Sequence, residues 1–142
     1  MEKLDRNFTV MQFANRPKRT QFWGVHIDDD SLVIKVLSGE KTATVCKADE
    51  YLSVSGEFDD GDMQVDDVID VHDLRGNFRC TIRITEVYPV RFGHIPEKLW
   101  RAECCKSEDH FRDVHRKAWS SEQIDDGFEM IATHFRLSDD HD

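Results

Sequence analysis

The hydrophobic and polar positions of this chain change their period several times, and each change marks a predicted element. In FRCTIRITEV (78–87), apolar residues alternate with arginine and threonine from Phe78 to Thr85. This alternation is typical of a strand with one buried face and a basic outer face. The segment DVIDVHD (67–73) precedes it, and LRGN (74–77) between them has turn chemistry. The pattern therefore predicts a β-hairpin.

Two further segments are predicted to be strands. TATVC (42–46) is rich in β-branched residues, and MIATHFRLS (130–138) forms a closing strand. The face of the closing strand that we expect to be buried carries Ile131, Phe135 and Leu137. Residues 48–66 indicate a strand fragment followed by an acidic loop. Together with a few short helices, these strands favour an α+β fold: a small β-barrel or rolled sheet of mostly antiparallel strands, flanked by helices.

Three short helices are predicted from apolar residues at helical spacing. Residues 32–37, LVIKVL, follow Asp28–Ser31, which suit a helix N-terminus, and Gly39 suits the left-handed position after the last turn. A second helix extends from Pro96 to Glu103. A third opens at residues 107–109, and its apolar stripe comprises Phe111, Val114, His115 and Ala118. Within that stripe, we interpret His115 as a structural histidine.

Length and charge narrow the class of protein. A chain of 142 residues suits a single domain, which we expect to have a core at 22–137, an N-terminal arm at 1–21 and an acidic tail at 138–142. With 29 acidic and 19 basic residues, the net charge of −10 repels long nucleic acids and anionic membranes. We expect a cytoplasmic protein with reduced thiols, since neither an apolar leader nor a CxxC spacing is seen. No HExxH or Cys/His cluster suggests a metal, and no cofactor is expected.

One carboxylate falls where an apolar residue would be expected. Glu103 is four residues after Leu99 and three after Trp100, so it projects from the apolar side of its helix. A buried glutamate generally needs a partner, although a glutamate at a helix end can also bend out to solvent. Lys41, between Gly39 and a strand, is a candidate partner. On a regular strand Lys41 and Thr44 would face opposite sides, so Lys41 would have to lie in the turn.

These residues occur in segments that resemble the ASCH domain family. LSGEKTAT resembles the family signature G-x-K-T-x-T, and IPEKLWRAE resembles its helix with a terminal acid. The similarity continues through the hairpin and the last helix and covers roughly residues 22–137. Two positions depart from the pattern: Cys46 stands where short members often carry arginine, and Asp66-Asp67 replace the usual Gly-Asp.

The resemblance implies a PUA-like fold and a choice of activities. Some small bacterial members are amidohydrolases that remove the acetyl group from N(4)-acetylcytidine with a lysine, a threonine and a glutamate. By motif, these catalytic residues correspond to Lys41, Thr44 and Glu103. Thr44 could be a nucleophile with Lys41 as its base, or Glu103 could activate water while Thr44 orients the substrate. A nucleoside would also need binding residues, for which the candidates are Trp23, Gly39, Tyr51 and Trp100, with Phe22 a further aromatic residue nearby.

Two other functions compete with this hypothesis. Other members of the family are RNA-binding or ribonucleolytic, and a local basic strip in this chain could contact RNA. The residues of this strip are Lys18, Arg19, Arg79 and Arg83. The domain could also have kept the fold, lost the chemistry and become a protein-interaction module. The expected partners are thus a small nucleoside or RNA and no membrane, and the sequence does not address the oligomeric state.

Overall fold

A single curled sheet forms the centre of the molecule. The computed structural model describes residues 18–22, 24, 26–51, 63–120 and 122–138. Its five strands lie in the order β1-β3-β4-β5-β2, and only the β1–β3 pair is parallel. Their bounds are β1 Lys18–Gln21, β2 Ala43–Lys47, β3 Val68–His72, β4 Phe78–Arg91 and β5 Glu129–Leu137. The expected α+β fold and the hairpin of β3 and β4 are therefore confirmed.

A bulge in β4 allows this one long strand to contribute to two cores. Ile84 pairs with Phe135 of β5, but the next residue of β5, His134, pairs with Glu86, so β4 has one extra residue here. An extra residue reverses which side chains face each side of the sheet. Ile84 therefore points into the first core, whereas Val90, also an even-numbered residue, points into the second core on the opposite face.

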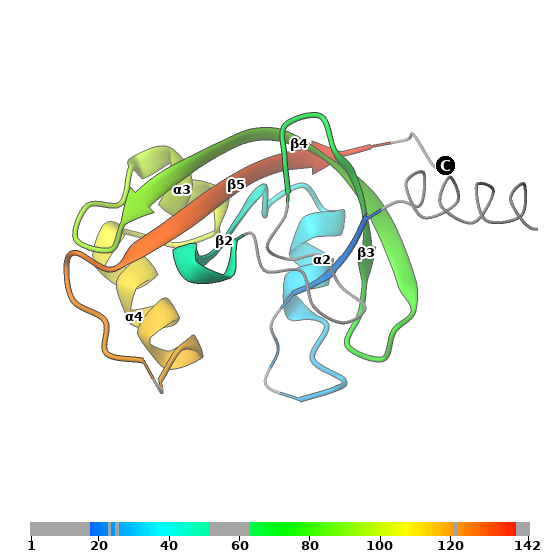
Figure 1. Cartoon of the computed structure of the whole chain (residues 1–142). Coiled ribbons are helices and arrows are strands. Elements are labelled where there is room, and N and C mark those ends of the chain that lie inside the picture. Colours follow the sequence, from blue (N-terminus) through cyan, green and yellow to red (C-terminus); the bar gives the residue numbers. More distant parts are fainter. Residues whose placement is uncertain (1–17, 23, 25, 52–62, 121, 139–142) are drawn as a thin grey trace, which may run out of the picture.

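The helices cover both faces of this sheet. Figure 1 shows the β4–β5 pair arching over α2 (Ser31–Leu37) at one end and α4 (Glu108–Ala118) at the other. The first core joins α2 to β3, β4 and β5, and the second joins α3 (Glu97–Ala102) and α4 to β2, β4 and β5. Within the described residues, no helix has the length and apolar character needed to cross a membrane.

The predicted helix ends are found where the sequence places them. Gly39 follows α2 with a φ of +83°, which confirms the left-handed stop. Before α2, the side chain of Asp29 accepts hydrogen bonds from the backbone nitrogen and the hydroxyl of Ser31. Ser107 caps α4, since its hydroxyl oxygen accepts a hydrogen bond from the His110 backbone nitrogen at 3.0 Å.

Several predicted buried positions are wrong in detail. Leu37 and Val114 are exposed, because α2 and α4 each bury a narrower stripe than the sequence suggested. Leu137 is also exposed, whereas Met130 and Ala132 on the other face of β5 are fully buried, because helices cover both sides of the sheet.

Three further predictions differ from the structure. Thr81, which was expected on the outer face of its strand, is buried. Residues 18–21, expected in a solvated arm, form the edge strand β1. The expected strand fragment after residue 48 begins instead as a short 3-10 helix, η1 (Ala48–Glu50), and 52–62 of the acidic loop lie outside the described residues.

The left-handed stop after α2 supplies a stability test. A Cβ added at Gly39 would meet no atom within 4 Å, so its cost lies only in the backbone conformation. We expect Gly39→Ala to destabilise the protein by about 1–2 kcal/mol in urea unfolding, because L-residues with a side chain disfavour positive φ. Gly127→Ala is the matched control, since its Cβ would make only ordinary contact and its φ is not positive. Equal unfolding midpoints for the two variants would contradict this expectation.

Candidate functional site

Lys41 and Glu103 form a buried ion pair. The Lys41 Nζ atom lies 3.1 Å from Glu103 Oε1, and their side chains are only 3% and 8% exposed. Lys41 lies in the connection between α2 and β2, and Glu103 is the residue directly after α3. The backbone nitrogen of Thr42 donates to the Ala102 carbonyl at 2.8 Å, which ties the two segments together. The expectation that Glu103 lies within ion-pair reach of Lys41 is therefore confirmed.

Further contacts hold the Lys41 ammonium in place. Nζ donates a 2.6 Å hydrogen bond to the Ala43 carbonyl, and it lies 5.4 Å from the centre of the Phe22 ring. The lysine side chain thus folds back from the turn before β2, as the spacing to Thr44 required. Two oxygen acceptors and an aromatic face together stabilise a charged ammonium that water barely reaches.

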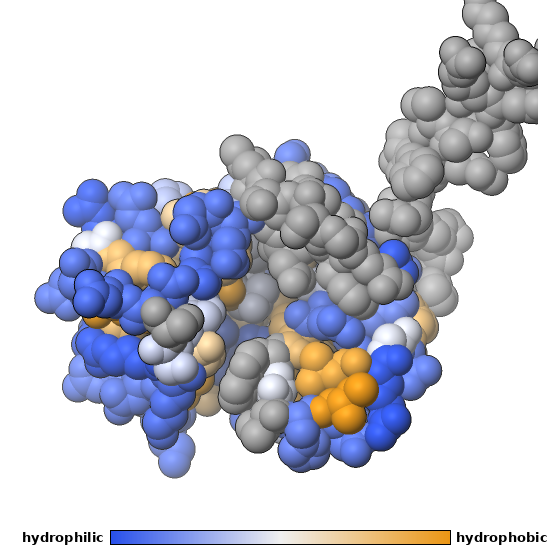
Figure 2. Space-filling model, turned by 60° about the horizontal axis from the view of Figure 1, so that its bottom comes forward, coloured by the Kyte–Doolittle hydropathy of each residue, from blue (hydrophilic) through white to orange (hydrophobic). Residues whose placement is uncertain are grey.

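The pair lies beside a cavity of about 410 Å³ on the concave side of the sheet. Figure 2 looks onto this side of the molecule, where the surface is hollowed between its two halves. Glu103 and Thr44 both line the cavity, whereas Lys41 does not and sits behind the carboxylate. The aromatic residues of the wall are Phe22 and Trp119. Any ligand in the cavity therefore meets Glu103 rather than the lysine.

Thr44 presents a hydroxyl to the same space. It is paired in register with Thr133 of β5, and both threonines line the cavity. Among the residues that the structure describes, the Thr44 hydroxyl has no hydrogen-bond partner. It is therefore available to bind a polar group of a ligand.

His115 is a cavity residue whose position was not predicted from the sequence. Its Nε2 atom lies 3.5 Å from Glu103 Oε2, while its Nδ1 atom is 2.8 Å from the carbonyl oxygen of Phe111. Within the described chain, Glu103 Oε2 is a buried oxygen without a hydrogen-bond partner. The sequence offered only a weak indication of this position. His115 and Trp119 are four residues apart at the end of α4, a spacing that places both on one side, and both line the cavity.

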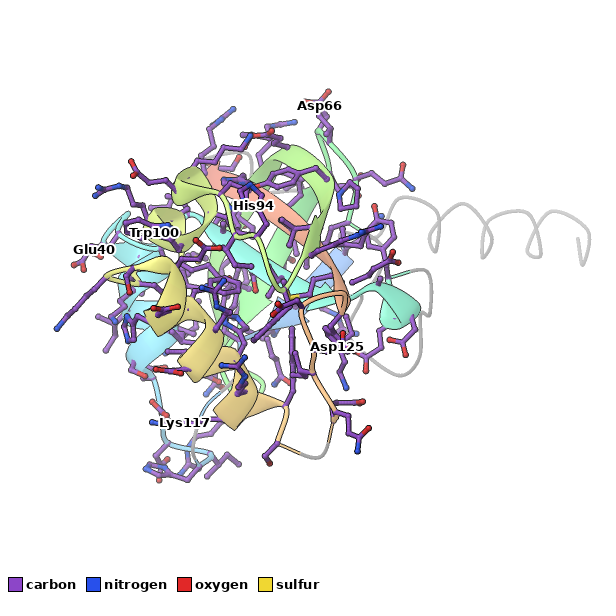
Figure 3. All side chains as sticks on the ribbon, turned by 90° about the vertical axis from the view of Figure 1, so that its left-hand side faces the viewer. Glu40, Asp66, His94, Trp100, Lys117 and Asp125 are labelled. Atoms are coloured by element: carbon purple, nitrogen blue, oxygen red, sulfur yellow. The ribbon has the colours of Figure 1, made fainter. Side chains whose placement is uncertain are left out.

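The expected nucleoside-binding residues are mostly found elsewhere. The Tyr51 hydroxyl donates to the Met63 carbonyl at 2.7 Å, and Trp100 packs on the second core with the Arg101 guanidinium over its ring. Neither these residues nor Gly39 lines the described part of the cavity. Figure 3 shows Trp100 on α3, apart from Lys117 near the end of α4. Trp23 lies outside the described residues.

Cys105 and Lys47 also line the cavity, and neither is suited to act as a nucleophile. Burial, together with the negative charge of Glu103, raises the pKa of the Cys105 thiol to about 11, so this thiol is neutral near pH 7. Hydrogen bonding to Glu122 raises the pKa of Lys47, which donates to that carboxylate at 2.7 Å. All four cysteines are free, as expected, and the described residues contain no cluster suited to a metal.

Two of the four basic residues that could have formed an RNA-binding strip have acidic partners. Lys18 pairs with Asp67 at 2.7 Å, and Arg79 pairs with Asp30 at 2.5 Å and with Asp73 at 3.4 Å. Such pairing offsets the positive charge that a phosphate backbone would otherwise meet.

Comparison with known proteins identifies the family of this chain and structures with a similar fold. The family model for the ASCH domain matches residues 19–139. A crystal structure of a protein from Enterococcus faecalis V583, of the family DUF984, superposes with a TM-score of 0.70 at 19% identity, covering 96% of this chain and 86% of that chain. A crystal structure of an ASCH domain from Lactobacillus crispatus JV V101 gives a TM-score of 0.66 at 18% identity, covering 96% and 95%. The curled five-stranded sheet with short helices is therefore the PUA-like α+β fold expected from the sequence. No curated protein sequence matches this chain significantly.

Proposed function

The chain belongs to the ASCH domain family, and from this premise we propose that it is an amidohydrolase that removes the acyl group from N(4)-acylated cytidine or related nucleosides. One observation carries the proposal: a buried carboxylate, Glu103, is paired with Lys41 and faces a cavity that Thr44 also lines. A buried carboxylate at a cavity wall is a candidate general base, because little water competes for its lone pairs.

Of the two routes considered from the sequence, the geometry supports the one in which Glu103 activates water. Glu103 removes one proton from a water molecule, whose oxygen then adds to the acyl carbon. Lys41 already donates to two oxygens and does not line the cavity, so it fixes the Glu103 carboxylate in place instead of meeting the substrate. The Thr44 hydroxyl, which is available for bonding, donates to the acyl oxygen and stabilises the charge that develops there.

The cavity also suits the substrate in size and character. A volume of about 410 Å³ falls within the usual range for small-ligand sites, which is roughly 300–1,000 Å³. Phe22, one of the aromatic candidates from the sequence, and Trp119, which was not one, supply aromatic surface for a flat base. In this proposal, the base packs on the aromatic wall while its acylated amine reaches Glu103.

The proposal is tested by incubating the purified chain with N(4)-acetylcytidine and separating the products by liquid chromatography. We expect cytidine and acetate to form in equal amounts. A panel with longer acyl groups and with the free base would define the acyl group and the need for the ribose. If none of these compounds is hydrolysed, the amidohydrolase proposal fails and a non-catalytic or RNA-directed role takes its place.

Weak RNA binding is a separate expectation of the same proposal. The net charge of −10 and the acidic partners of Lys18 and Arg79 both oppose contact with a phosphate backbone. Fluorescence anisotropy with single-stranded and structured RNA at physiological salt should therefore show only weak binding. Tight binding that falls steeply with added salt would indicate several phosphate contacts, and it would favour an RNA-binding or ribonucleolytic module over a nucleoside hydrolase.

A further inference from the structure

We propose that His115 is a further catalytic residue of this site, which shares one proton with Glu103 and delivers it to the leaving nitrogen of the substrate. The delivery step rests on the proposed amide hydrolysis. The shared proton follows from the geometry of the two side chains and can be measured without any substrate.

The orientation of the His115 ring determines which nitrogen faces Glu103. Nδ1 lies 2.8 Å from the Phe111 carbonyl oxygen, which can only accept a hydrogen bond, so Nδ1 carries a hydrogen. The ring stacks on Phe111 at 4.0 Å between centroids and contacts Trp119 at 5.3 Å. These contacts leave Nε2 as the nitrogen directed at Glu103.

In their neutral and ionised forms, respectively, His115 Nε2 and Glu103 Oε2 face each other with no hydrogen between them. A neutral His115 would turn the lone pair of Nε2 toward Oε2 of an ionised Glu103 across 3.5 Å, with side chains only 10% and 8% exposed. Oε2 has no hydrogen-bond partner among the described residues, and leaving such an oxygen unpaired is costly. A single proton between the two atoms satisfies both of them.

The immediate surroundings favour keeping this proton on Nε2. Lys41 binds the other oxygen of Glu103 and thereby stabilises the negative carboxylate. His115 lies in the last turn of α4, where the free backbone carbonyls favour a cation. The thiol of Cys105, which lines the same wall, is neutral near pH 7 because burial raises its pKa.

More distant charges largely balance one another. Lys47 and Glu50 also line the cavity, and they lie 3.3 Å apart as an ion pair. Arg116 and Lys117, which follow His115 in α4, are exposed to solvent, so water screens their repulsion of an imidazolium. An imidazolium at His115 beside a carboxylate at Glu103 is therefore the arrangement that these charges support.

The proton completes the proposed reaction. Glu103 takes one proton from water as the water oxygen bonds to the acyl carbon, and the carbonyl electrons move to the acyl oxygen. When the carbonyl re-forms, the C–N bond breaks and its electron pair stays on the nitrogen, which takes the proton from His115 Nε2. The products are a carboxylic acid and cytidine. The proton on Glu103 then moves to Nε2, so the site returns to its starting state.

Nuclear magnetic resonance of the full-length chain tests the shared proton directly. The protein is labelled with ¹⁵N-histidine, and the ring nitrogens are observed at pH 7 without ligand. We expect both nitrogens of His115 to carry hydrogen in the wild type, and Nε2 to lose its hydrogen in Glu103→Gln, whose neutral amide can donate to that nitrogen. The exposed His94 serves as an internal control and should not change. An identical state of Nε2 in both proteins would overturn the proposal.

Kinetics test the delivery step. His115→Gln should lower kcat for N(4)-acetylcytidine by about 100-fold, the low end for a lost proton-transfer group, with KM little changed. The loss should be smaller for the 5-fluoro derivative, because its leaving amine needs less protonation, and His94→Gln should match the wild type.

These experiments distinguish a failure of the His115 proposal from a failure of the proposed amidohydrolase function. Equal losses of kcat for both substrates, or a loss confined to KM, would make His115 a packing residue and overturn the delivery step. A wild type that hydrolyses no acylated cytosine compound removes the proposed function and the delivery step together. In that case the resonance experiment, which uses no variant of His115, still decides whether the proton is shared.

Discussion

Replacing Glu103 with glutamine is expected to lower N(4)-acetylcytidine hydrolysis by at least about 100-fold, the low end for a lost general base. Glutamine has nearly the same shape, and its carbonyl oxygen can still accept the hydrogen bond that Lys41 donates to Glu103 Oε1. It cannot, however, take a proton from water. The loss should appear in kcat, which is measured from initial rates of cytidine formation.

The matched control for this variant is Glu97→Gln on the same helix. Glu97 is exposed and pairs with Arg101, one turn further along α3, so its loss should leave the rate unchanged. Thermal unfolding of both variants separates lost chemistry from lost structure. Wild-type turnover in a folded Glu103→Gln protein would remove Glu103 from the catalytic step.

Removing the ammonium of Lys41 is expected to have the largest effect on stability. Lys41→Met removes the ammonium that pairs with Oε1 of the buried Glu103, and breaking a buried pair in this way typically costs about 3–5 kcal/mol. Folded domains are stable by only about 5–15 kcal/mol, so the variant should unfold at much lower urea concentration. The double variant Lys41→Met/Glu103→Gln should recover part of the loss, because its neutral amide does not need the ammonium that has been removed.

Lys98→Met provides the comparison for an exposed pair. Lys98 binds Glu86 at 2.6 Å with both side chains about half exposed, and such pairs contribute about 0–1 kcal/mol. Equal stability losses for Lys41→Met and Lys98→Met would contradict the buried pair.

Lys41→Arg then separates the two catalytic routes considered from the sequence. Arginine keeps the positive charge but cannot give up a proton. A folded variant that retains activity supports a fixed charge, and a folded but inactive one supports Lys41 as the base.

Local sequence patterns supplied the candidates for one half of the site. The inward position of Glu103 follows from its spacing to Leu99 on a short helix, and the turn that holds Lys41 follows from the Gly39 stop. Both depend on the regular geometry of a single element. The strand and helix order of the PUA-like fold was predictable for the same reason, and the family resemblance pointed to the same pair of residues, Lys41 and Glu103.

The other half depends on how distant elements pack. His115 reaches Glu103 only because α4 lies against the end of α3, and nothing in its helical stripe distinguishes a cavity histidine from a core one. The bulge near Ile84 reverses the faces of β4, which no alternating pattern reveals. Trp100 was assigned to substrate binding from its chemistry alone, whereas its place on α3 directs it to the second core.

The most direct test of the account is a count of turnovers. Purified wild type, Glu103→Gln and Glu97→Gln are each incubated with excess N(4)-acetylcytidine, and cytidine is quantified against the enzyme concentration. We predict many cytidine molecules per wild-type and per Glu97→Gln molecule, and at least about 100-fold less product from Glu103→Gln. Cytidine that forms at the same rate in all three samples, or in none of them, would contradict the claim that the Lys41–Glu103 pair is the centre of an amidohydrolase.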